Sequence, residues 1–392
     1  MSQSFMEKLL KGAKVEWKAL GEVIISNTGG GTPSKAKSEY WNGEIPWASV
    51  GDLSIDGHFI KKTRNHVTSE GLKDSSSNLI SKGDVIVAVK ISPGKMKIAG
   101  IDLAINQDLR GLKLKDEISA KFLNYYFQIL ILQGTGTIVK AITSKDLEKI
   151  QIPIPPLPVQ VEIVRILDAF TELTTELTAE LTARKKQYNY YRDQLLSFDE
   201  GEVEWRALGE TLVRTKGTNI TAGQMKELNK YGAPLKVFAG GRTVAFVNFE
   251  DIPAKDVNRE PSIIVKSRGV IEFEYYDKPF SHKNEMWSYH SKNEGINIKY
   301  VYYFLKMNEP YFRSIGSKMQ MPQIATPDTD KFQIPIPPLA EQERIVAILD
   351  KFDALTSSIS EGLPREIRLR QKQYEHYREL LLSFPKAEVG PT

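Results

Sequence analysis

Cysteine is absent from the sequence, which excludes disulfide bonds and thiol chemistry and suits a reducing compartment. Residues 1–14 are mixed polar and apolar and do not form the pattern of a signal peptide. No apolar run approaches the length of a membrane span. We therefore expect a cytoplasmic protein.

Histidine is scarce as well, and the five histidines, at positions 58, 66, 282, 290 and 376, show no spacing typical of metal ligands. Three catalytic patterns are missing: the glycine–serine–glycine nucleophile elbow, a glycine-rich dinucleotide fingerprint after a strand, and the Asn/Asp-Pro-Pro-aromatic signature of amino-group methyltransferases. We therefore expect a chain without catalytic residues, metal or cofactor of its own.

Two stretches match catalytic motifs only in part. Gly29–Lys35 is rich in glycine, but it lacks the glycine before the lysine of a phosphate loop, and Pro33 removes a backbone donor. A turn is the better interpretation, and contact with a DNA phosphate is the alternative. Asp84 with Val87–Lys90 is faintly similar to a nuclease strand, but position 88 is alanine instead of the middle acidic residue. A buried strand is the better interpretation there.

The main positive feature of the sequence is an internal repeat. Gln151–Leu157 returns unchanged as Gln333–Leu339, and each copy leads into a helical pattern. Val15–Glu22 recurs as Val203–Glu210 with one residue changed. The architecture is therefore one unit written twice: a globular segment, a proline segment and a long helix.

After each proline segment, apolar residues recur at steps of three and four, which is the pattern of one helix face. A helix from Gln160 to Phe198 would be about 58 Å long at roughly 1.5 Å per residue, too long to bury its apolar stripe alone. Ala340–Phe384 is the natural partner, so we expect two long antiparallel helices in a coiled coil. The residues expected in its seam are Ile163, Leu167, Phe170, Leu177, Leu181, Tyr188, Leu195, Ile345, Leu349, Phe352, Ile359, Ile367, Tyr374 and Leu381.

The second helical copy holds four additional residues, around Glu361–Pro364. This insertion predicts a stutter in the coiled coil and a local kink at Pro364. At the corresponding place the first copy is a run of four-residue Thr-Glu-Leu and Thr-Ala-Glu-Leu units, each adding about 6 Å of helix. An ordinary solvated coiled coil with accidental low complexity is the alternative.

The fold class that follows is α+β: two globular domains with mixed α/β sheets, separated by the two long antiparallel helices and related by a pseudo-twofold axis. The expected boundaries are a tail at 1–14, a first globular domain at 15–150, a proline segment and central helix at 151–200, a second globular domain at 201–332, a proline segment and C-terminal helix at 333–384, and a tail at 385–392.

Within the globular domains the pattern predicts paired elements. Strands are expected at Asp84–Val89 and Ser262–Val265, and helices at 118–130 and Ile296–Leu305. The two domains align at an offset of 178 residues, which pairs Asn106 with Asn284 and Lys121 with Lys299. The domains therefore share a layout while their residues differ.

The net charge of +4 is compatible with an anionic partner and too small to name one. In predicted loops, however, basic and amide side chains stand among aromatic ones. Lys and Arg neutralise phosphates, and Asn, Gln, Arg and Lys can pair with base edges. For any single residue a solvated surface group is the simpler interpretation, whereas the clusters favour DNA binding. The candidates are Thr32, Ser34, Lys35, Lys37, Lys90, Lys95, Lys97, Asn106 and Gln107 in the first domain, and Arg242, Thr243, Lys266, Arg268, Lys278, His282, Lys283, Asn284, Lys318, Gln320 and Gln323 in the second.

Several motifs of the chain resemble those of a known family. Ile-Pro-Ile-Pro-Pro-Leu, followed by Gln, Ile-Val and Ile-Leu-Asp, occurs twice before a long helix and resembles the specificity subunit of type I restriction–modification systems. Gly30–Ser34 with Ile45–Trp47 is similar to the opening of one type of target recognition domain. The Thr-Ala-Glu-Leu units, Lys185–Tyr188 and Leu363–Ile367 resemble the IC subfamily. The resemblance covers essentially the whole chain.

The resemblance implies that each globular domain is a target recognition domain that binds one half of a bipartite site in double-stranded DNA. It implies that the helices set the spacing and dock two methyltransferase (modification) subunits, and that two restriction subunits complete a bacterial or archaeal complex. Those partners would use S-adenosylmethionine, Mg²⁺ and ATP for adenine-N6 methylation and ATP-dependent DNA cleavage. The alternative, from another class, is a two-domain coiled-coil adaptor without DNA affinity.

Overall fold

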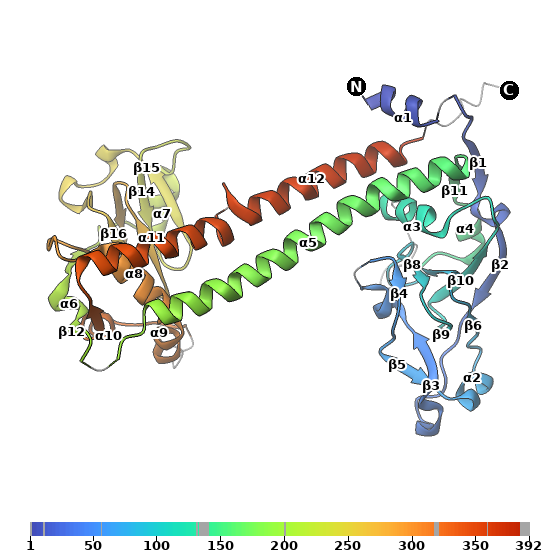
Figure 1. Cartoon of the computed structure of the whole chain (residues 1–392), viewed down its shortest axis with the longest axis horizontal. Helices are drawn as coiled ribbons and strands as arrows, with labels where there is room; N and C mark the ends of the chain where they lie inside the picture. Colours follow the sequence, from blue (N-terminus) through green and yellow to red (C-terminus); the bar gives the residue numbers. More distant parts are fainter. Residues whose placement is uncertain are drawn as a thin grey trace. The chain divides into compact units, whose positions relative to one another are not determined.

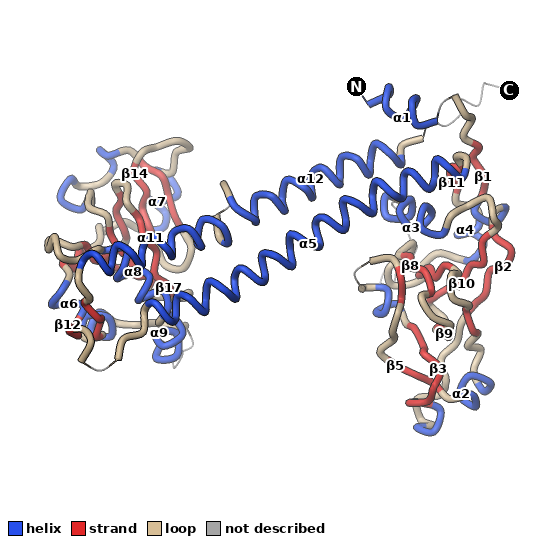
Figure 2. Tube along the Cα trace, in the orientation of Figure 1, coloured by secondary structure: helices blue, strands red, loops and turns tan. Residues whose placement is uncertain are grey.

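The computed structural model describes residues 2–10, 12–55, 57–130, 132, 141–199, 201–316, 321–358 and 360–384 (Figure 1). The chain divides into two compact units: unit 1 comprises Met1–Glu176 with Ile367–Thr392, and unit 2 comprises Leu177–Glu366. Each unit combines a globular segment of helices and strands with parts of the long helices (Figure 2). The predicted fold class, two mixed α/β halves that carry long helices, is confirmed.

Unit 1 contains two main sheets and a two-stranded ribbon. The strand order is β2-β10-β7-β8-β4 in one sheet and β5-β3-β9-β6 in the other, and β1 pairs with β11. The strands are β1 (Glu16–Ala19), β2 (Ile24–Gly29), β3 (Trp41–Ala48), β4 (Phe59–Ile60), β5 (Asn65–Val67), β6 (Leu79–Ile80), β7 (Val85–Ala88), β8 (Met96–Ala99), β9 (Leu103–Ile105), β10 (Leu109–Leu114) and β11 (Gln151–Ile154). The short helices are α1 (Ser2–Leu10), α2 (Ser69–Asp74), α3 (Ala120–Ile129) and α4 (Ser144–Glu148), with 3-10 turns η1 (Leu20–Glu22), η2 (Ser38–Tyr40) and η3 (Val50–Leu53).

Unit 2 repeats this plan with different strand lengths. Its sheets have the orders β13-β19-β16-β17 and β15-β14-β18, and β12 pairs with β20. The strands are β12 (Glu204–Ala207), β13 (Val213–Lys216), β14 (Leu235–Phe238), β15 (Val244–Val247), β16 (Ser262–Lys266), β17 (Glu272–Tyr276), β18 (Phe280–His282), β19 (Trp287–His290) and β20 (Gln333–Ile336). The short helices are α6 (Leu208–Thr211), α7 (Ala222–Leu228), α8 (Ile298–Met307), α9 (Glu309–Gly316) and α10 (Thr326–Asp330), with 3-10 turns η4 (Phe249–Asp251) and η5 (Ala254–Asp256).

A fully buried strand lies at the centre of each main sheet. All four side chains of β7 and all five of β16 are buried, and both strands are rich in β-branched residues, which suit a sheet covered on both faces. Helix α3 packs against β8, and α8 packs against β16 and β17. The strands and helices predicted in the two globular domains are therefore confirmed, with ends shifted by a few residues.

The glutamine of the repeated motif fixes the start of each long helix. Gln160 is fully buried, and its side-chain oxygen accepts the backbone N–H of Ser119 (2.8 Å). Its amide donates to the carbonyl oxygens of Pro155 (2.8 Å) and Glu117 (2.9 Å). Gln342 makes the corresponding three bonds in unit 2. One buried side chain thus ties the proline segment to the helix of its own globular domain.

The aspartate of the repeated Ile-Leu-Asp motif has a similar role. Asp168 accepts hydrogen bonds from Lys121 (2.6 Å) and the Tyr125 hydroxyl (2.8 Å), both on α3. Burial alone would raise the pKa of Asp168, but these bonds hold that pKa below its usual value. Asp350 binds Lys299 (2.7 Å) in unit 2. The alignment of Lys121 with Lys299 is therefore correct.

The two long helical segments differ. Helix α5 (Leu157–Leu195) is continuous over 39 residues, whereas the second copy forms two helices, α11 (Leu339–Thr356) and α12 (Gly362–Leu382). The expectation of one helix over Ala340–Phe384 with a kink at Pro364 is therefore wrong. Helix α11 ends at Thr356, and α12 begins at Gly362, whose φ of +74° lies in the left-handed region. Pro364 lies in the first turn of α12, where proline is tolerated.

The apolar stripe of the long helices contacts more than a partner helix. In unit 1, Ile163, Leu167 and Leu381 belong to the core of the globular domain, and in unit 2 Ile345 and Leu349 do. The remaining seam residues within the described ranges, which are Phe170, Leu177, Leu181, Tyr188, Leu195, Phe352, Ile367 and Tyr374, are half-buried. Ile359 lies outside the described residues.

Ring contacts join the helices within each unit. In unit 1, Phe170 of α5 stacks on Tyr377 of α12 with centroids 5.2 Å apart. In unit 2, Tyr191 of α5 stacks on Phe352 of α11 at 5.8 Å, and Tyr188 lies 6.1 Å from the same ring. Aromatic side chains therefore contribute to the helix–helix contacts in both units.

Candidate nucleic-acid interface

In unit 1, the candidate site begins where two parallel strands end side by side. Ala48 at the end of β3 pairs with Ile105 at the end of β9, so Ser49 and Asn106 follow at the same edge. The glycine-rich loop after β2 lies against this edge, because a β-carbon on Gly30 would be only 2.1 Å from the Ile105 carbonyl oxygen. The glycines thus allow a close approach of backbone to backbone.

These loops enclose a hollow of about 660 Å³ in unit 1. Trp47 donates its indole N–H to the carbonyl oxygen of Gly31 (3.1 Å), and Trp41 packs edge-on against Trp47 with centroids 5.2 Å apart. The hollow therefore has an aromatic wall below a polar rim. Its lining residues are Thr32, Lys35, Trp41, Trp47, Ser49, Asn65, Asn106, Gln107 and Asp108.

The polar rim of this hollow is internally connected. Asn106 is buried, donates its amide to the Asp108 carboxylate (3.2 Å) and accepts the Asp108 backbone N–H (3.2 Å), so it shapes the loop. Lys90 lies 3.6 Å from Asp108 and balances its charge. Gln107 is exposed and accepts a hydrogen bond from the Thr32 hydroxyl. The outward-facing groups of the rim are thus an amide, a hydroxyl and a lysine.

Unit 2 has a corresponding edge, because β14 and β18 also run parallel and end side by side. Four loops form the surface at this edge. Gly241 donates its backbone N–H to the carbonyl oxygen of Arg268 (3.1 Å), and Arg268 bridges to Gln323. The Ser267 hydroxyl donates to the carbonyl oxygen of Glu285 (2.6 Å). We name residues 240–243, 267–270, 283–286 and 321–323 the four-loop surface.

The strand register shows that the two surfaces share one frame. Ile105 and His282 correspond, because each is the last residue of its strand paired with the neighbouring parallel strand. Three residues further on, Asp108 corresponds to Glu285, and each carboxylate lies near a lysine, Lys90 at 3.6 Å and Lys283 at 2.9 Å. The frame therefore places an acidic residue at the same position in both units, and each unit supplies the neighbouring lysine from a different position.

The same register corrects one sequence alignment. Counting from Ile105 and His282, Asn106 corresponds to Lys283, and Gln107 corresponds to Asn284. The offset is 177 residues at this edge and 178 at Lys121 and Lys299. One additional residue in unit 2 before α8 accounts for the difference, and a fixed offset cannot detect it.

Besides Asn106, two candidates from the sequence are buried, so the expectation of exposed loop residues is wrong for all three. The Lys266 ammonium lies 2.7 Å from Glu272 and 2.8 Å from Glu274. Although burial lowers it, the pKa of Lys266 is raised overall by hydrogen bonds to these two carboxylates. His282 is fully buried, donor or acceptor to Ser288 Oγ (3.2 Å), and burial lowers its pKa. Both side chains are held inside unit 2.

The remaining candidates are distributed over the surface. Thr243, Arg242, Arg268, Asn284 and Gln323 are exposed on the four-loop surface, and Lys283 is half-buried there. Lys95 donates to the Ser54 hydroxyl (2.7 Å), and Lys97 donates to the carbonyl oxygen of Gly57. Three further candidates are exposed but belong neither to the lining of the hollow nor to the four-loop surface: Ser34, Lys37 and Lys278. Lys318 and Gln320 lie outside the described residues.

Sequence reasoning missed several residues at these edges. Ser49, Asn65 and Asp108 line the hollow of unit 1 and stand in no recognisable motif, and Trp47 was noted only within the Ile45–Trp47 motif. They meet only because β3 pairs with β9, across more than fifty residues of sequence. Glu272 of unit 2 was also missed, because its contacts with Lys266 and Arg242 arise from the fold and not from a local motif.

Within the described ranges, no group of three or more His, Cys, Asp and Glu side chains has a geometry that could hold a metal ion. None of the helices within these ranges has the length and apolar character needed to cross a membrane. What the two edges offer is hydrogen-bonding groups, cations and aromatic surface.

Comparison with known proteins identifies the family. The model of the type I restriction modification DNA specificity domain matches residues 13–184 and 212–369, one match in each half of the chain. The EcoR124I/EcoR124II type I restriction enzyme specificity subunit of Escherichia coli is 36% identical, with 98% of each chain covered. The EcoprrI specificity subunit of Escherichia coli is 34% identical over 91% of this chain and 92% of that protein.

Solved structures agree with these matches at the level of the fold. A type I restriction–modification S subunit from M. genitalium superposes with a TM-score of 0.60 at 17% identity, covering 96% of this chain and 98% of that one. A chain described under complex assembly and conformational transition of the type I system gives a TM-score of 0.61, covering 94% and 98%. The chain therefore belongs to the type I restriction–modification DNA specificity family.

Proposed function

We propose that this chain is the DNA-specificity subunit of a type I restriction–modification complex, in which unit 1 and unit 2 each bind one half of a bipartite site in double-stranded DNA. One observation carries this proposal: both units present the same strand-end edge, with an acidic residue at the same position, Asp108 or Glu285, but with different side chains around it. The shared backbone arrangement is suited to DNA binding by both units, and the different exposed side chains are suited to recognise different half-site sequences.

The chemistry of the two edges supports DNA as the ligand. Arginine, lysine and side-chain amides are the groups that contact phosphates and base edges, and the family relatives are named as specificity subunits. In unit 1 these groups are Lys35, Lys90 and Gln107, and in unit 2 Arg242 and Arg268. Base contacts of this kind specify a sequence without any reaction on this chain.

The catalytic work belongs to partners in this proposal. The long helices dock two modification subunits and set the spacing between half-sites, and two restriction subunits complete the complex in the cytoplasm. S-adenosylmethionine, Mg²⁺ and ATP are used by those subunits, which give the complex adenine-N6 methylation and ATP-dependent DNA cleavage. The buried contacts of Gln160 and Gln342 support this role, because they hold each helix in a defined position on its globular domain.

The decisive experiment is genome-wide mapping of methylated adenines with and without this chain, in cells that keep the modification subunits. We expect a single bipartite motif that disappears with the chain and returns with it. The purified chain with modification subunits should also shift a duplex that carries the motif, and not a scrambled one. Unchanged methylation together with no gel shift would instead indicate an adaptor without DNA affinity.

A further inference from the structure

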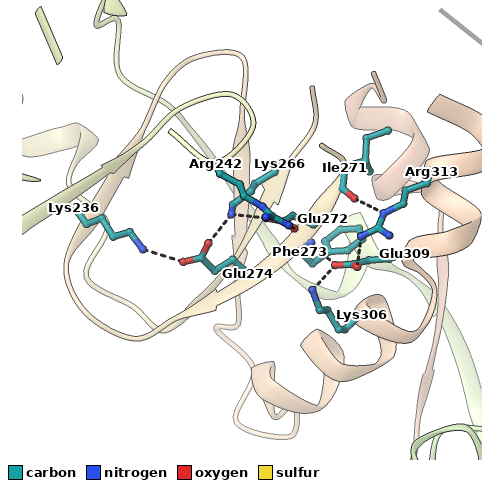
Figure 3. Close-up of polar contacts among 10 residues, drawn as sticks. All are labelled: Lys236, Arg242, Lys266, Ile271, Glu272, Phe273, Glu274, Lys306, Glu309 and Arg313. Carbon is teal, nitrogen blue, oxygen red and sulfur yellow. Dashed lines mark hydrogen bonds and ion pairs between the residues drawn. The ribbon is translucent and has the colours of Figure 1, made fainter. Parts of the chain in front are cut away.

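Beneath the four-loop surface, unit 2 contains a chain of ion pairs (Figure 3). Its centre is Lys266, whose side chain is 7% exposed and whose ammonium contacts both Glu272 (2.7 Å) and Glu274 (2.8 Å). Glu274 continues to Lys236 at 2.9 Å, and Glu272 continues to Arg242 at 3.7 Å. Three cations thus surround two carboxylates, and the chain of contacts ends at the surface on Arg242.

The strand that carries Glu272 is itself anchored. Glu309 is buried, and its carboxylate accepts the backbone N–H of Phe273 (2.9 Å) and hydrogen bonds from Lys306 (2.8 Å) and Arg313 (2.9 Å) (Figure 3). Glu272 is the residue next to Phe273, so its position is set by strand pairing on one side and by this carboxylate on the other. Glu272 therefore presents a carboxylate in a fixed position to the loop of residues 240–243.

Arg242 is exposed and oriented at the same time. Its side chain is 78% exposed, whereas that of Glu272 is 14% exposed and lies under the loop. Glu272 shares its charge between Lys266 at 2.7 Å and Arg242 at 3.7 Å, so it attracts the guanidinium without closing on it as a bidentate pair. The neighbouring Gly241 is tied to Arg268 by a backbone hydrogen bond. The planar guanidinium of Arg242 is thereby directed from an anchored loop into solvent.

Corresponding positions in unit 1 and unit 2 show which cationic side chains occur in both units and which occur in only one. Lys90 and Arg268 occupy the same place, because each forms the isolated bridge that follows the central strand. Where unit 2 has Arg242 in a tight turn before β15, unit 1 has the 3-10 turn η3, which buries Asp52. A cationic side chain that is present in both units is suited to bind the phosphates common to all DNA. A cationic side chain that is present in only one unit is suited to recognise a base in one half-site.

We propose that Arg242 reads a guanine in the half-site bound by unit 2, and that Glu272 is the positioning residue that orients its guanidinium. This inference rests on the proposed function. Among the bases, guanine presents two acceptors, O6 and N7, at the spacing that the arginine fork can bind with two parallel hydrogen bonds. Glu272 directs the fork before DNA arrives, which reduces the side-chain freedom lost on binding.

The first test compares Arg242→Ala and Arg242→Lys with the wild-type chain, each assembled with its modification subunits. Methylation is measured on a library in which every base pair of both half-sites is varied. We expect the preference for guanine at one position of one half-site to fall by about 10- to 100-fold in both variants. The preferences at the other positions, and in the other half-site, should stay as in the wild type.

The second test removes the acceptor instead of the donor. Binding of the assembled complex is measured on duplexes in which that guanine is replaced by 7-deazaguanine, which lacks N7. The wild type should lose affinity on this substitution, and Arg242→Ala should lose little more, because the hydrogen bond is already absent. Equal losses for both proteins would show that Arg242 does not contact that N7.

Glu272 is tested against a matched control, Glu274. Glu272→Gln and Glu274→Gln each remove one carboxylate charge beside Lys266 and leave the other carboxylate in place, but only Glu272 contacts Arg242. We expect Glu272→Gln to weaken the guanine preference several-fold at the same position as Arg242→Ala, and Glu274→Gln to keep it. Thermal unfolding of the complexes shows whether both variants are equally folded.

The outcomes are distinguishable. If the wild-type complex methylates no defined motif, the proposed function fails. If it does, and Arg242→Ala changes no base preference, or weakens all sequences equally as loss of a phosphate contact would, the assignment of Arg242 is overturned. If Arg242→Ala relaxes the guanine position while Glu272→Gln and Glu274→Gln behave alike, Arg242 stands and the positioning role of Glu272 is overturned.

Discussion

The hairpins β7–β8 and β16–β17 occupy the same place in the two units and carry opposite charges. Strand pairing sets Lys97 opposite Ile86 in unit 1 and Glu274 opposite Ile264 in unit 2, so these two residues correspond. By the same register, Lys95 corresponds to Glu272. Unit 1 thus presents two lysines where unit 2 presents two glutamates that need cations of their own.

The centre of the hairpin shows how unit 2 supports this change. The position of the buried Lys266 is occupied in unit 1 by Ala88, since both residues end the central strand. Two neighbouring carboxylates that are partly removed from water are costly unless they are paired, and the buried Lys266 pairs with both. Charge at the surface and charge in the interior therefore changed together, while the backbone frame stayed the same.

The contacts that did not change are those between each globular domain and its long helix. Gln160 and Gln342 make the same three hydrogen bonds, and Asp168 and Asp350 each hold a lysine of the packed helix. Such groups cannot vary singly, because removal of one partner leaves buried donors and acceptors unpaired. The comparison teaches that divergence is confined to surfaces whose buried partners can change with them.

The largest effect is expected from exchange of a whole surface. Replacing residues 22–150 with the matching segment of a relative should change one half of the DNA site completely and leave the other half unaltered, because the two edges lie in separate units. Mapping of methylated adenines measures both halves at once. A change in both half-sites would contradict the independence of the two units.

The next effect is on stability. Lys266→Ala should destabilise unit 2 by about 3–5 kcal/mol, because two partly buried carboxylates lose the buried cation that they share. Hydrogen exchange of the β16–β17 amides in the full chain measures this loss locally. The triple change Lys266→Ala, Glu272→Gln and Glu274→Gln is the control and should recover part of this loss, since no carboxylate is then left without the shared cation, although Lys236 loses its partner Glu274.

The pH dependence of that loss follows from the pKa shifts. Burial raises the pKa of Glu274, but hydrogen bonds from Lys266 and Lys236 lower it overall below 4.5, so its contribution is present above that pH and is lost as pH falls through the folded value. The pKa of Lys266 is raised above 10.5, so its contribution is present below that pH and is lost as pH rises further. The difference between wild type and Lys266→Ala should therefore be largest between these limits, and a difference that grew in acid would contradict it.

A smaller and symmetric effect is expected at the repeated glutamines. Gln160→Ala and Gln342→Ala each leave one backbone N–H and two carbonyl groups without their partner, at a cost of about 2–4 kcal/mol. Hydrogen exchange in α3 for the first variant and in α8 for the second provides the measurement. Clearly unequal losses would show that the two junctions differ despite their identical contacts.

The smallest effect is expected from the cation shared by both units. Lys90→Ala and Arg268→Ala should each lower the slope of log affinity against log salt by about 0.9 and leave the methylated motif unchanged, because a phosphate contact carries no sequence information. Gel shifts of the assembled complex at several salt concentrations measure the slope. A changed base preference in either variant would move that residue to the base-reading class, beside Arg242.

Local periodicity explains what could be predicted. The proline segments, the helical steps of three and four, and the β-branched runs of β7 and β16 are read from neighbouring residues, so the first long helix and the central strands were predicted correctly. The break before Gly362 was missed because the additional residues were interpreted as an insertion within a helix. The preceding serines instead form side-chain bonds, as in the Ser358 hydroxyl that accepts the Glu361 backbone N–H (3.1 Å).

By itself, the sequence determined that this protein is one unit written twice, with repeated scaffold motifs and different surfaces, because repetition and period are properties of the chain alone. Only the tertiary structure decided which polar residues face solvent. Lys266 and Arg242 look alike as basic residues in sequence, but strand pairing buries the first between two glutamates and leaves the second exposed above them. The physical reason is that burial and ion pairing depend on neighbours brought together by the sheet, and these neighbours lie far apart along the chain.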